Sequence, residues 1–407
     1  MSLPSLQQRL QNALAAIGSD DDPKVQALHQ LFDQAQSQTV DLLNGRTTSS
    51  PQHHILANIQ SLLTNATLLP NQNGALVASS VTSEGDLVGT LKYESLDVEW
   101  TEAAICWLEH FPTAQKALFP TNPPPIMTMG SAVTIAIAGD WGTGISYRTD
   151  GQPSGAGKVK DEINNLHPDY TVHLGDVYYA GTQGEEQQNF LGLWPAGGQA
   201  SFALNANHEM YSGAQGYFGK TLADPQFSAQ KSNSYFALKN QDWLVIGLDT
   251  AYHADEINLY QNGNLDPGQC AYVTDLLNNA ANQKVILLTH HNGLSTDGAT
   301  TVDLWEQLAP LFAGREVWWY WGHLHAGIVY ADRGTIHPRC CGHGAVPAGA
   351  PSGLNPNPAV LWCENNLAGD PTYTGRVKNG FVLLSLNESD LTEAFVNEDG
   401  MTVYPKP

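Results

Sequence analysis

The second part of the chain contains short apolar runs, each of which ends in a small cluster of polar residues. Residues 133–138 read Val-Thr-Ile-Ala-Ile-Ala and lead directly into Gly139 and Asp140. Continuous apolar runs of this length, separated by segments of helical pattern, indicate buried strands that alternate with helices. The pattern predicts an α/β fold whose ligand site lies at the carboxyl ends of the strands. Three later runs end in the same manner, at residues 170–174, 285–289 and 317–321.

The N-terminal part of the chain has a different pattern. Apolar residues from Leu3 to Ile17 recur at three- and four-residue spacing, which predicts an amphipathic helix. Asp22 and Pro23 then supply the cap and first-turn residues of a second helix. Consecutive prolines at 123–125 cannot join a helix or a central strand, so they indicate a linker. We expect a mostly helical N-terminal domain of unknown role at 1–118, a proline-rich linker at 119–130 and a larger domain at 131–407.

The charge balance limits the partners of the protein. Forty Asp and Glu residues stand against 18 Lys and Arg residues, which gives a formal net charge of −22. A surface of this sign repels phosphate backbones and anionic membranes, so we expect neither nucleic acid as a general partner nor a membrane surface. An anionic ligand would need a local positive charge, which bound metal cations can supply.

Location is less constrained by the sequence. No basic segment followed by an apolar run begins the chain, and no apolar run approaches the length of a membrane span, so we expect a soluble protein without a signal peptide. An odd number of cysteines leaves at least one free thiol and favours a reducing, cytoplasmic compartment, while a secreted form stays open. The five cysteines are Cys106, Cys270, Cys340, Cys341 and Cys363.

Five polar clusters follow one another in the second part of the chain. Taken alone, a Gly-Asp pair after a strand is usually a turn or a cap, and a single strand-end histidine is usually a satisfied one. His323 and His325 are a sharper signal, because residues two apart on extended backbone face the same side. Oxygen and imidazole donors from separate strand ends are typical of a binuclear metal site. The clusters are residues 139–142, 175–179, 205–209, 289–291 and 322–325.

The order of these clusters resembles the calcineurin-like metallophosphoesterase superfamily, in its purple acid phosphatase-like branch. The resemblance covers residues 131–400 and implies a four-layer α/β/β/α sandwich. It rests on Asp-x-Gly, Gly-Asp-x-x-Tyr, Asn-His-Glu, a strand-end His and Gly-His-x-His. In this sequence these are Asp140-Trp141-Gly142, Gly175-Asp176-Val177-Tyr178-Tyr179, Asn207-His208-Glu209, His290 and Gly322-His323-Leu324-His325.

The first two motifs depart from most of the superfamily in a coherent way. Most of the superfamily has a histidine that binds the first metal where Gly142 stands in this sequence. Purple acid phosphatases lack that histidine and have a tyrosine ligand in the second motif instead. Tyr179 stands at the spacing of that tyrosine. The resemblance implies two metal ions, with Asp176 bridging them. A ferric ion would be held by Asp140, Tyr179 and His325, and a divalent zinc, iron or manganese ion by Asn207, His290 and His323.

The remaining residues have implied roles at the substrate. The resemblance implies that His208 contacts the phosphate or protonates the leaving group, and that Glu209 orients His208. His291 contacts substrate or is a satisfied strand-end histidine, and both readings stay open. His291 is also the alternative metal ligand to His290. Cys341 and His343, in a segment that departs from the family pattern, either reach the site or are buried.

The implied activity is hydrolysis of a small phosphoester by a metal-activated hydroxide. We expect an acid phosphatase-like phosphomonoesterase. A phosphodiesterase or phosphotriesterase with the same site is the alternative, and a non-catalytic binding module is a third.

Overall fold

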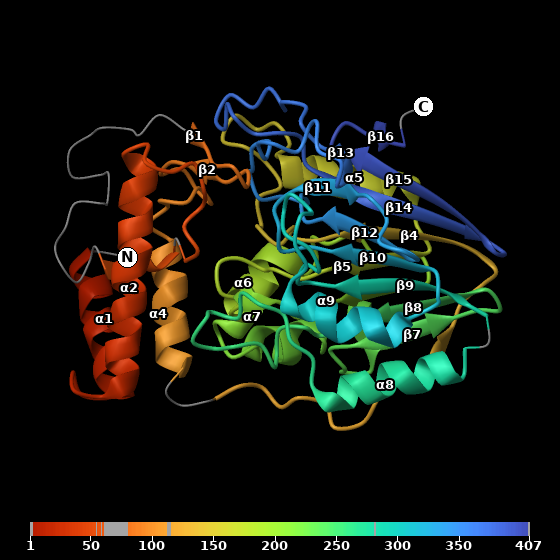
Figure 1. Ribbon diagram of the computed structural model, residues 1–407, viewed down its shortest axis with the longest axis horizontal. Helices are drawn as coiled ribbons and strands as arrows, with labels where there is room; N and C mark the ends of the chain where they lie inside the picture. Colours follow the sequence, from red (N-terminus) through yellow and green to blue (C-terminus); the bar gives the residue numbers. More distant parts are fainter. Residues whose placement is uncertain are drawn as a thin grey trace.

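The computed structural model describes residues 3–53, 55–57, 59–60, 80–111, 115–280 and 282–405. Within these ranges two large sheets lie beside a group of N-terminal helices (Figure 1). No helix among the described residues is both long enough and apolar enough to span a membrane. Residues 61–79 of the predicted N-terminal domain lie outside the described residues.

The N-terminal part is mostly helical, as its spacing predicts. Its main helices are α1 (Leu3–Ile17), α2 (Pro23–Leu43) and α4 (Trp100–His110). Asp22 caps α2 by accepting a hydrogen bond from the Lys24 N–H group, at 2.8 Å. A short antiparallel pair, β1 (Ser80–Val81) and β2 (Leu87–Val88), lies between α2 and α4 in the chain.

These helices share a hydrophobic core with the larger part of the protein. Trp100 and Trp107 of α4 belong to the same buried cluster as Tyr179, Met210 and Tyr260. Figure 1 shows α4 beside the short helices α6 (Gln183–Glu185) and α7 (Asn207–Met210). The boundary at residue 118 stays a prediction, because apolar contacts cross it.

The larger part is built on two sheets that pack face to face. One sheet has the order β13-β11-β12-β10-β9-β8-β7-β3, and the other has the order β16-β15-β14-β4-β5-β6. The first comprises β3 (Met127–Thr128), β7 (Phe236–Lys239), β8 (Trp243–Gly247), β9 (Lys284–Thr289), β10 (Val317–Trp321), β11 (Gly327–Tyr330), β12 (Ile336–Cys341) and β13 (Val360–Cys363). The second comprises β4 (Ala132–Ala138), β5 (Tyr170–His173), β6 (Ala200–Ala203), β14 (Gly380–Asn387), β15 (Asp390–Asn397) and β16 (Thr402–Tyr404).

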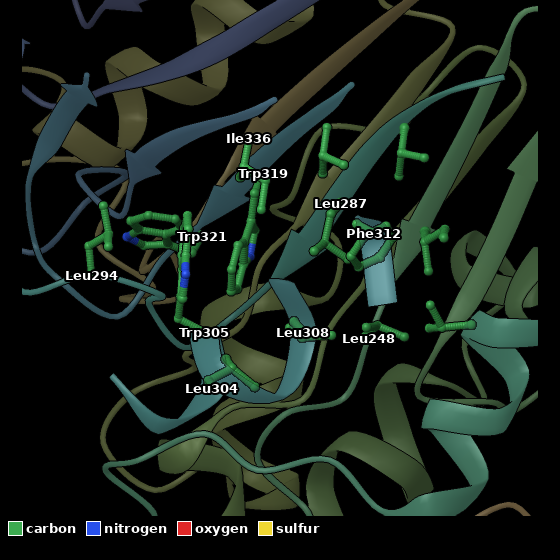
Figure 2. Packing of buried hydrophobic residues seen from close by; sticks show 14 of the residues in the cluster. Leu248, Leu287, Leu294, Leu304, Trp305, Leu308, Phe312, Trp319, Trp321 and Ile336 are labelled. Atoms are coloured by element: carbon green, nitrogen blue, oxygen red, sulfur yellow. The ribbon is translucent and has the colours of Figure 1, made fainter. Parts of the chain in front are cut away.

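Helices cover the outer faces of both sheets. Between the sheets, a buried cluster joins Ile135 and Val172 of one sheet to Ile286 and Tyr320 of the other. On the outside of the larger sheet, helix α8 (Pro267–Asn278) and helix α9 (Asp303–Leu308) cover the strands, and Figure 2 shows Trp305 and its neighbours packed against the strand residues Trp319 and Trp321. Helix α5 (Gly155–Leu166) covers the other sheet through Val159 and Ile163. The four-layer α/β/β/α arrangement is confirmed.

Parallel pairing places the polar clusters together. Strands β4, β5 and β6 are parallel neighbours in one sheet, and β8, β9 and β10 are parallel neighbours in the other. Their carboxyl ends therefore meet at one edge of the sandwich, where ligands bind in folds of this class. The loops after β4, β5, β6, β9 and β10 carry the five clusters.

Candidate metal centre

The loops after β4, β5 and β10 turn sharply, so that their polar side chains converge. Asp140, Asp176 and His323 all have left-handed backbone, with φ values of 59°, 76° and 65°. Such conformations are costly for residues other than glycine and cluster at functional sites. The Asp140 N–H group donates to the Gly175 carbonyl at 3.0 Å, which joins the first two loops.

Gly142 has no room for a side chain. A Cβ atom there would lie 2.6 Å from the Asp176 carbonyl oxygen and 2.8 Å from Cα of Val177. Both contacts are with backbone, so they cannot be relieved by a rotamer change. The close approach of the two motif loops therefore excludes the histidine that most of the superfamily carries at this position.

One group of donors contains Asp140, Asp176 and His325, whose ligand atoms all lie within 4.8 Å of one another. Nε2 of His325 is 3.5 Å from Oδ1 of Asp140. The hydroxyl of Tyr178 lies among them, 3.2 Å from Oδ1 of Asp140, 3.1 Å from Oδ2 of Asp176 and 3.2 Å from Nε2 of His325. Two carboxylates, an imidazole and a phenol therefore meet at one point.

The second group contains Asn207, His290 and His323. Oδ1 of Asn207 lies 2.8 Å from Nε2 of His290 and 3.2 Å from Nδ1 of His323. Oδ1 of Asp176 lies 3.4 Å from the same His290 nitrogen. Asp176 is thus the residue whose two carboxylate oxygens face both groups, as the implied bridging role requires.

The hydrogen bonds around His290 direct an unshared lone pair into the site. Its Nδ1 lies 3.0 Å from the Leu174 carbonyl, to which it donates, and burial beside His291 and His323 lowers its pKa well below the ordinary value. A neutral imidazole has one N–H group, so Nε2 is an acceptor. The amide nitrogen of Asn207 is engaged with the Tyr211 hydroxyl at 3.2 Å, which leaves its oxygen facing that acceptor.

Two acceptors that face each other in a buried place are unfavourable unless a cation lies between them. Burial and the neighbouring Asp176 carboxylate raise the pKa of Asp140 well above its usual range. Burial and neighbouring histidines lower the pKa of His323. Oxygen and imidazole donors in this state fit two hard or borderline cations.

Tyr179 does not lie with the donors that the sequence pattern assigns to it. Its hydroxyl donates to Oδ2 of Asp97, in the N-terminal part, at 2.5 Å. Its ring packs between Tyr93 and Trp100, with ring centroids 4.8 and 4.7 Å away. Tyr178 occupies the expected place instead. The spacing in the sequence does not reveal this exchange, because the two tyrosines are adjacent and Asp97 is remote in the chain.

His208 faces the site from the turn after β6. Its Nε2 lies 3.7 Å from Oδ2 of Asp176, and its Nδ1 lies 2.7 Å from the Tyr179 carbonyl oxygen. Glu209 does not contact this ring. Its carboxylate accepts hydrogen bonds from the N–H groups of Asp176 and Val177, at 3.3 and 3.1 Å, so it holds the Asp176 loop rather than orienting His208.

His291 is a satisfied histidine. Its Nδ1 lies 2.8 Å from the Thr250 hydroxyl and its Nε2 lies 2.7 Å from the Tyr260 carbonyl. One of its ring nitrogens lies within 4.8 Å of ligand atoms of His290 and His323. Both nitrogens have partners in this structure, and the substrate contact stays a prediction. Cys341 and His343 are buried as well, and neither lines the pocket beside the donors.

A pocket of about 200 Å³ opens over the two donor groups. Part of its lining comes from the motif loops, including His208 and His325, and another part comes from the N-terminal residues. Ser50 fixes this N-terminal lining, because its N–H group donates to Glu84 at 2.7 Å and its hydroxyl donates to Asp86. No motif in the sequence marks which N-terminal residues reach the site. They are Ser50, Pro51, Gln52, His53, Ile55, Glu84 and Asp86.

The family model for calcineurin-like phosphoesterases matches residues 133–327. No curated protein matches the chain.

Three solved structures are similar to the chain. The inner membrane complex anchor GAP50 of Plasmodium is 16% identical with a TM-score of 0.47, over 68% of this chain and 88% of that one. PhoD is 11% identical with a TM-score of 0.41, over 70% and 73% of the two chains. A predicted phosphoesterase from Streptococcus pneumoniae is 11% identical with a TM-score of 0.27, over 68% and 95%.

The matched segment begins in β4 and ends at the start of β11, so it contains the loops that carry both donor groups. On this match, residues 133–327 form a calcineurin-like phosphoesterase domain.

Proposed function

We propose that the protein is a binuclear metal-dependent phosphoester hydrolase of the purple acid phosphatase-like kind. The observation that carries the proposal is Asp176, whose two carboxylate oxygens face two separate groups of nitrogen and oxygen donors. Hydrolysis of a phosphoester by two paired cations requires a carboxylate that bridges the cations, and Asp176 lies where such a carboxylate is expected.

The donors divide into two sets. Asp140, Tyr178 and His325 would hold one ion, Asn207, His290 and His323 would hold the other, and Asp176 would be shared. Cations bound there supply positive charge for the anionic ester and acidify water to give a nucleophile near neutral pH. We assign the phenol donor to Tyr178 in place of Tyr179, and a ferric ion belongs with the phenol, since phenolate is a strong donor for a trivalent cation.

The chain itself supplies a proton donor and a closed pocket. His208 lies beside the Asp176 carboxylate and lines the pocket, so it is placed to contact the phosphoryl group or to protonate the leaving oxygen. The Tyr179 carbonyl fixes the orientation of this ring through Nδ1. The N-terminal lining limits the space for the leaving group, which favours a small phosphomonoester.

A phosphodiester is the second candidate, and the charge of the pocket favours it. Among the described residues that line the pocket, none is Lys or Arg, whereas Glu84 and Asp86 are acidic. A dianionic monoester would rely on the metal ions alone for its positive charge. A diester carries one charge fewer and is repelled less.

Metal analysis of the purified protein, combined with a panel of small mono-, di- and triesters, tests the proposal. We expect two metal ions per chain and hydrolysis of a small monoester or diester. Metal binding without turnover of any ester would favour a non-catalytic binding role. Failure to bind two ions would refute the binuclear centre.

A further inference from the structure

Two adjacent tyrosines on the loop after β5 have opposite environments. Tyr178 is fully buried with its hydroxyl among the carboxylates of the candidate metal centre, whereas the Tyr179 hydroxyl faces the N-terminal part. Both side chains end in the same phenol, so local chemistry does not decide which of them faces the donors. The partners of the two hydroxyls distinguish them, and the partner of Tyr179 lies outside the loop.

Asp97 makes the selecting contact. Its Oδ2 atom accepts hydrogen bonds from the Tyr179 hydroxyl at 2.5 Å and from the Tyr93 N–H group at 2.7 Å, while Oδ1 accepts from the Glu99 N–H group at 3.0 Å. Backbone donors therefore hold the carboxylate in place before it meets the tyrosine. A charged acceptor in a buried place makes a strong hydrogen bond to a phenol.

Aromatic packing completes the enclosure of Tyr179. The edge of Trp100 meets its ring at an interplanar angle of 87°, and Tyr93 packs against the ring at 30°. Trp100 also contacts His208, with ring centroids 5.5 Å apart. The N-terminal residues thus touch both Tyr179 and the candidate proton donor.

The position of Tyr179 has two consequences at the centre. Its carbonyl oxygen lies 2.7 Å from Nδ1 of His208, so the backbone of this residue orients the imidazole. Its side chain points away from the donors. The Tyr178 hydroxyl therefore occupies the space beside His325 and lies 3.2 Å from Nε2 of that histidine. One contact to Asp97 therefore influences a metal donor and a proton donor together.

We propose that Asp97 is a positioning residue that holds Tyr179 away from the metal centre and so selects Tyr178 as its phenol donor. The inference rests on the proposed binuclear centre. It gives the N-terminal part a role in the site, because a residue before the phosphoesterase domain determines which tyrosine serves the metal. Without Asp97, the Tyr179 hydroxyl would lose its buried acceptor and compete with Tyr178 for the donor group.

A double-mutant cycle on the full chain tests the selection, with Fe³⁺ affinity from competition with a chromophoric chelator as the readout. Tyr178→Phe is expected to weaken Fe³⁺ binding by at least about tenfold, as loss of a metal-site partner does. Tyr179→Phe is expected to leave it unchanged. Asp97→Ala is expected to weaken binding several-fold when Tyr179 is present and to have no effect in the Tyr179→Phe background.

The cycle separates positioning from general support of the fold. An equal loss from Asp97→Ala in both backgrounds would mean that Asp97 only stabilises the structure, and would overturn the proposal. A loss of affinity from Tyr179→Phe but not from Tyr178→Phe would overturn it as well. Asp97→Asn, which keeps an acceptor oxygen, is the matched variant and is expected to lie between the wild type and Asp97→Ala.

A second readout needs no metal. Nitration of the metal-free protein by tetranitromethane, followed by peptide mass spectrometry, reports the accessibility of each tyrosine. Asp97→Ala is expected to raise nitration of Tyr179 several-fold, while Tyr147, which is 67% exposed, serves as the unchanged internal control. Unchanged nitration of Tyr179 would refute the role of Asp97. Absence of Fe³⁺ binding by the wild type would instead refute the proposed metal centre.

Discussion

The carboxylate of Asp176 lies between two donor groups, with Oδ1 3.4 Å from Nε2 of His290 and Oδ2 3.1 Å from the Tyr178 hydroxyl. The side chain is 1% exposed, so water does not compensate its charge. A buried carboxylate that faces donors on both sides is the feature around which the other residues of the site are arranged.

Asp176→Asn is expected to lower kcat/KM by more than the ~100-fold typical of a lost outer-shell partner, because it removes the shared negative charge. Metal content should fall from two ions per chain. Plasma emission spectroscopy and steady-state kinetics measure both effects. Asp161→Asn, on the exposed surface of α5, is the matched control. Full activity of the Asp176 variant would contradict a bridging role.

His208→Gln is expected to lower kcat by about 10²–10⁴-fold for an ester with a poor leaving group, since general acid catalysis contributes that much. The loss should be far smaller for p-nitrophenyl phosphate, whose leaving group needs little protonation. Metal content should not change, because His208 is outside both donor sets. Equal losses for good and poor leaving groups would show that His208 binds the phosphoryl group without donating a proton.

Gly142→His is expected to disturb the centre instead of adding a ligand. A Cβ atom at this position meets backbone atoms at 2.6 and 2.8 Å, so the Asp176 loop must move. Overpacking of this kind costs about 1–3 kcal/mol of unfolding free energy. Urea unfolding and metal analysis measure the two effects. Gly184→Ala, where a Cβ atom meets nothing closer than 3.9 Å, is the control.

His173→Phe is expected to improve stability in acid. The ring is buried against Phe190 and Trp194, its Nε2 has no hydrogen-bond partner, and burial lowers its pKa to about 3. The unfolded chain takes up a proton below its ordinary pKa of about 6.5, whereas the folded protein does not until about pH 3. The free energy of unfolding therefore falls as the pH falls through this range.

At pH 5 the neutral, buried His173 lowers the free energy of unfolding by on the order of 2 kcal/mol relative to neutral pH. Phenylalanine keeps the aromatic packing and has no proton to bind, so the variant should lack this part of the pH dependence. Urea unfolding of both proteins at pH 7 and pH 5 makes the comparison. The same difference in stability at both pH values would show that His173 does not stay neutral in the folded protein.

The fold could be predicted from local pattern because its strands are short apolar runs with polar ends. The residues after β4, β5, β9 and β10 were located in this way, and parallel pairing then brings their side chains to one edge of the sandwich. The capped helix α2 follows from Asp22 and Pro23 for an equally local reason. These features depend on neighbours in sequence, which one sequence displays in full.

The exchange of Tyr178 and Tyr179 could not be predicted in this way. It depends on Asp97, which is 82 residues from Tyr179 in the chain. The satisfied state of His291 depends on Thr250 and Tyr260, which come from another loop. Contacts of this kind have no periodicity or spacing that marks them in advance.

The sequence by itself therefore determined the class of fold, the order of the motif loops and most of the polar residues that meet at the strand ends. Tertiary structure decided which tyrosine faces those donors, which residues of the N-terminal part close the pocket, and what Glu209 holds. The physical reason is that strand and loop patterns arise from local backbone preference and burial. The choice between two identical phenols, in contrast, arises from one buried carboxylate that only the folded chain brings within hydrogen-bonding distance.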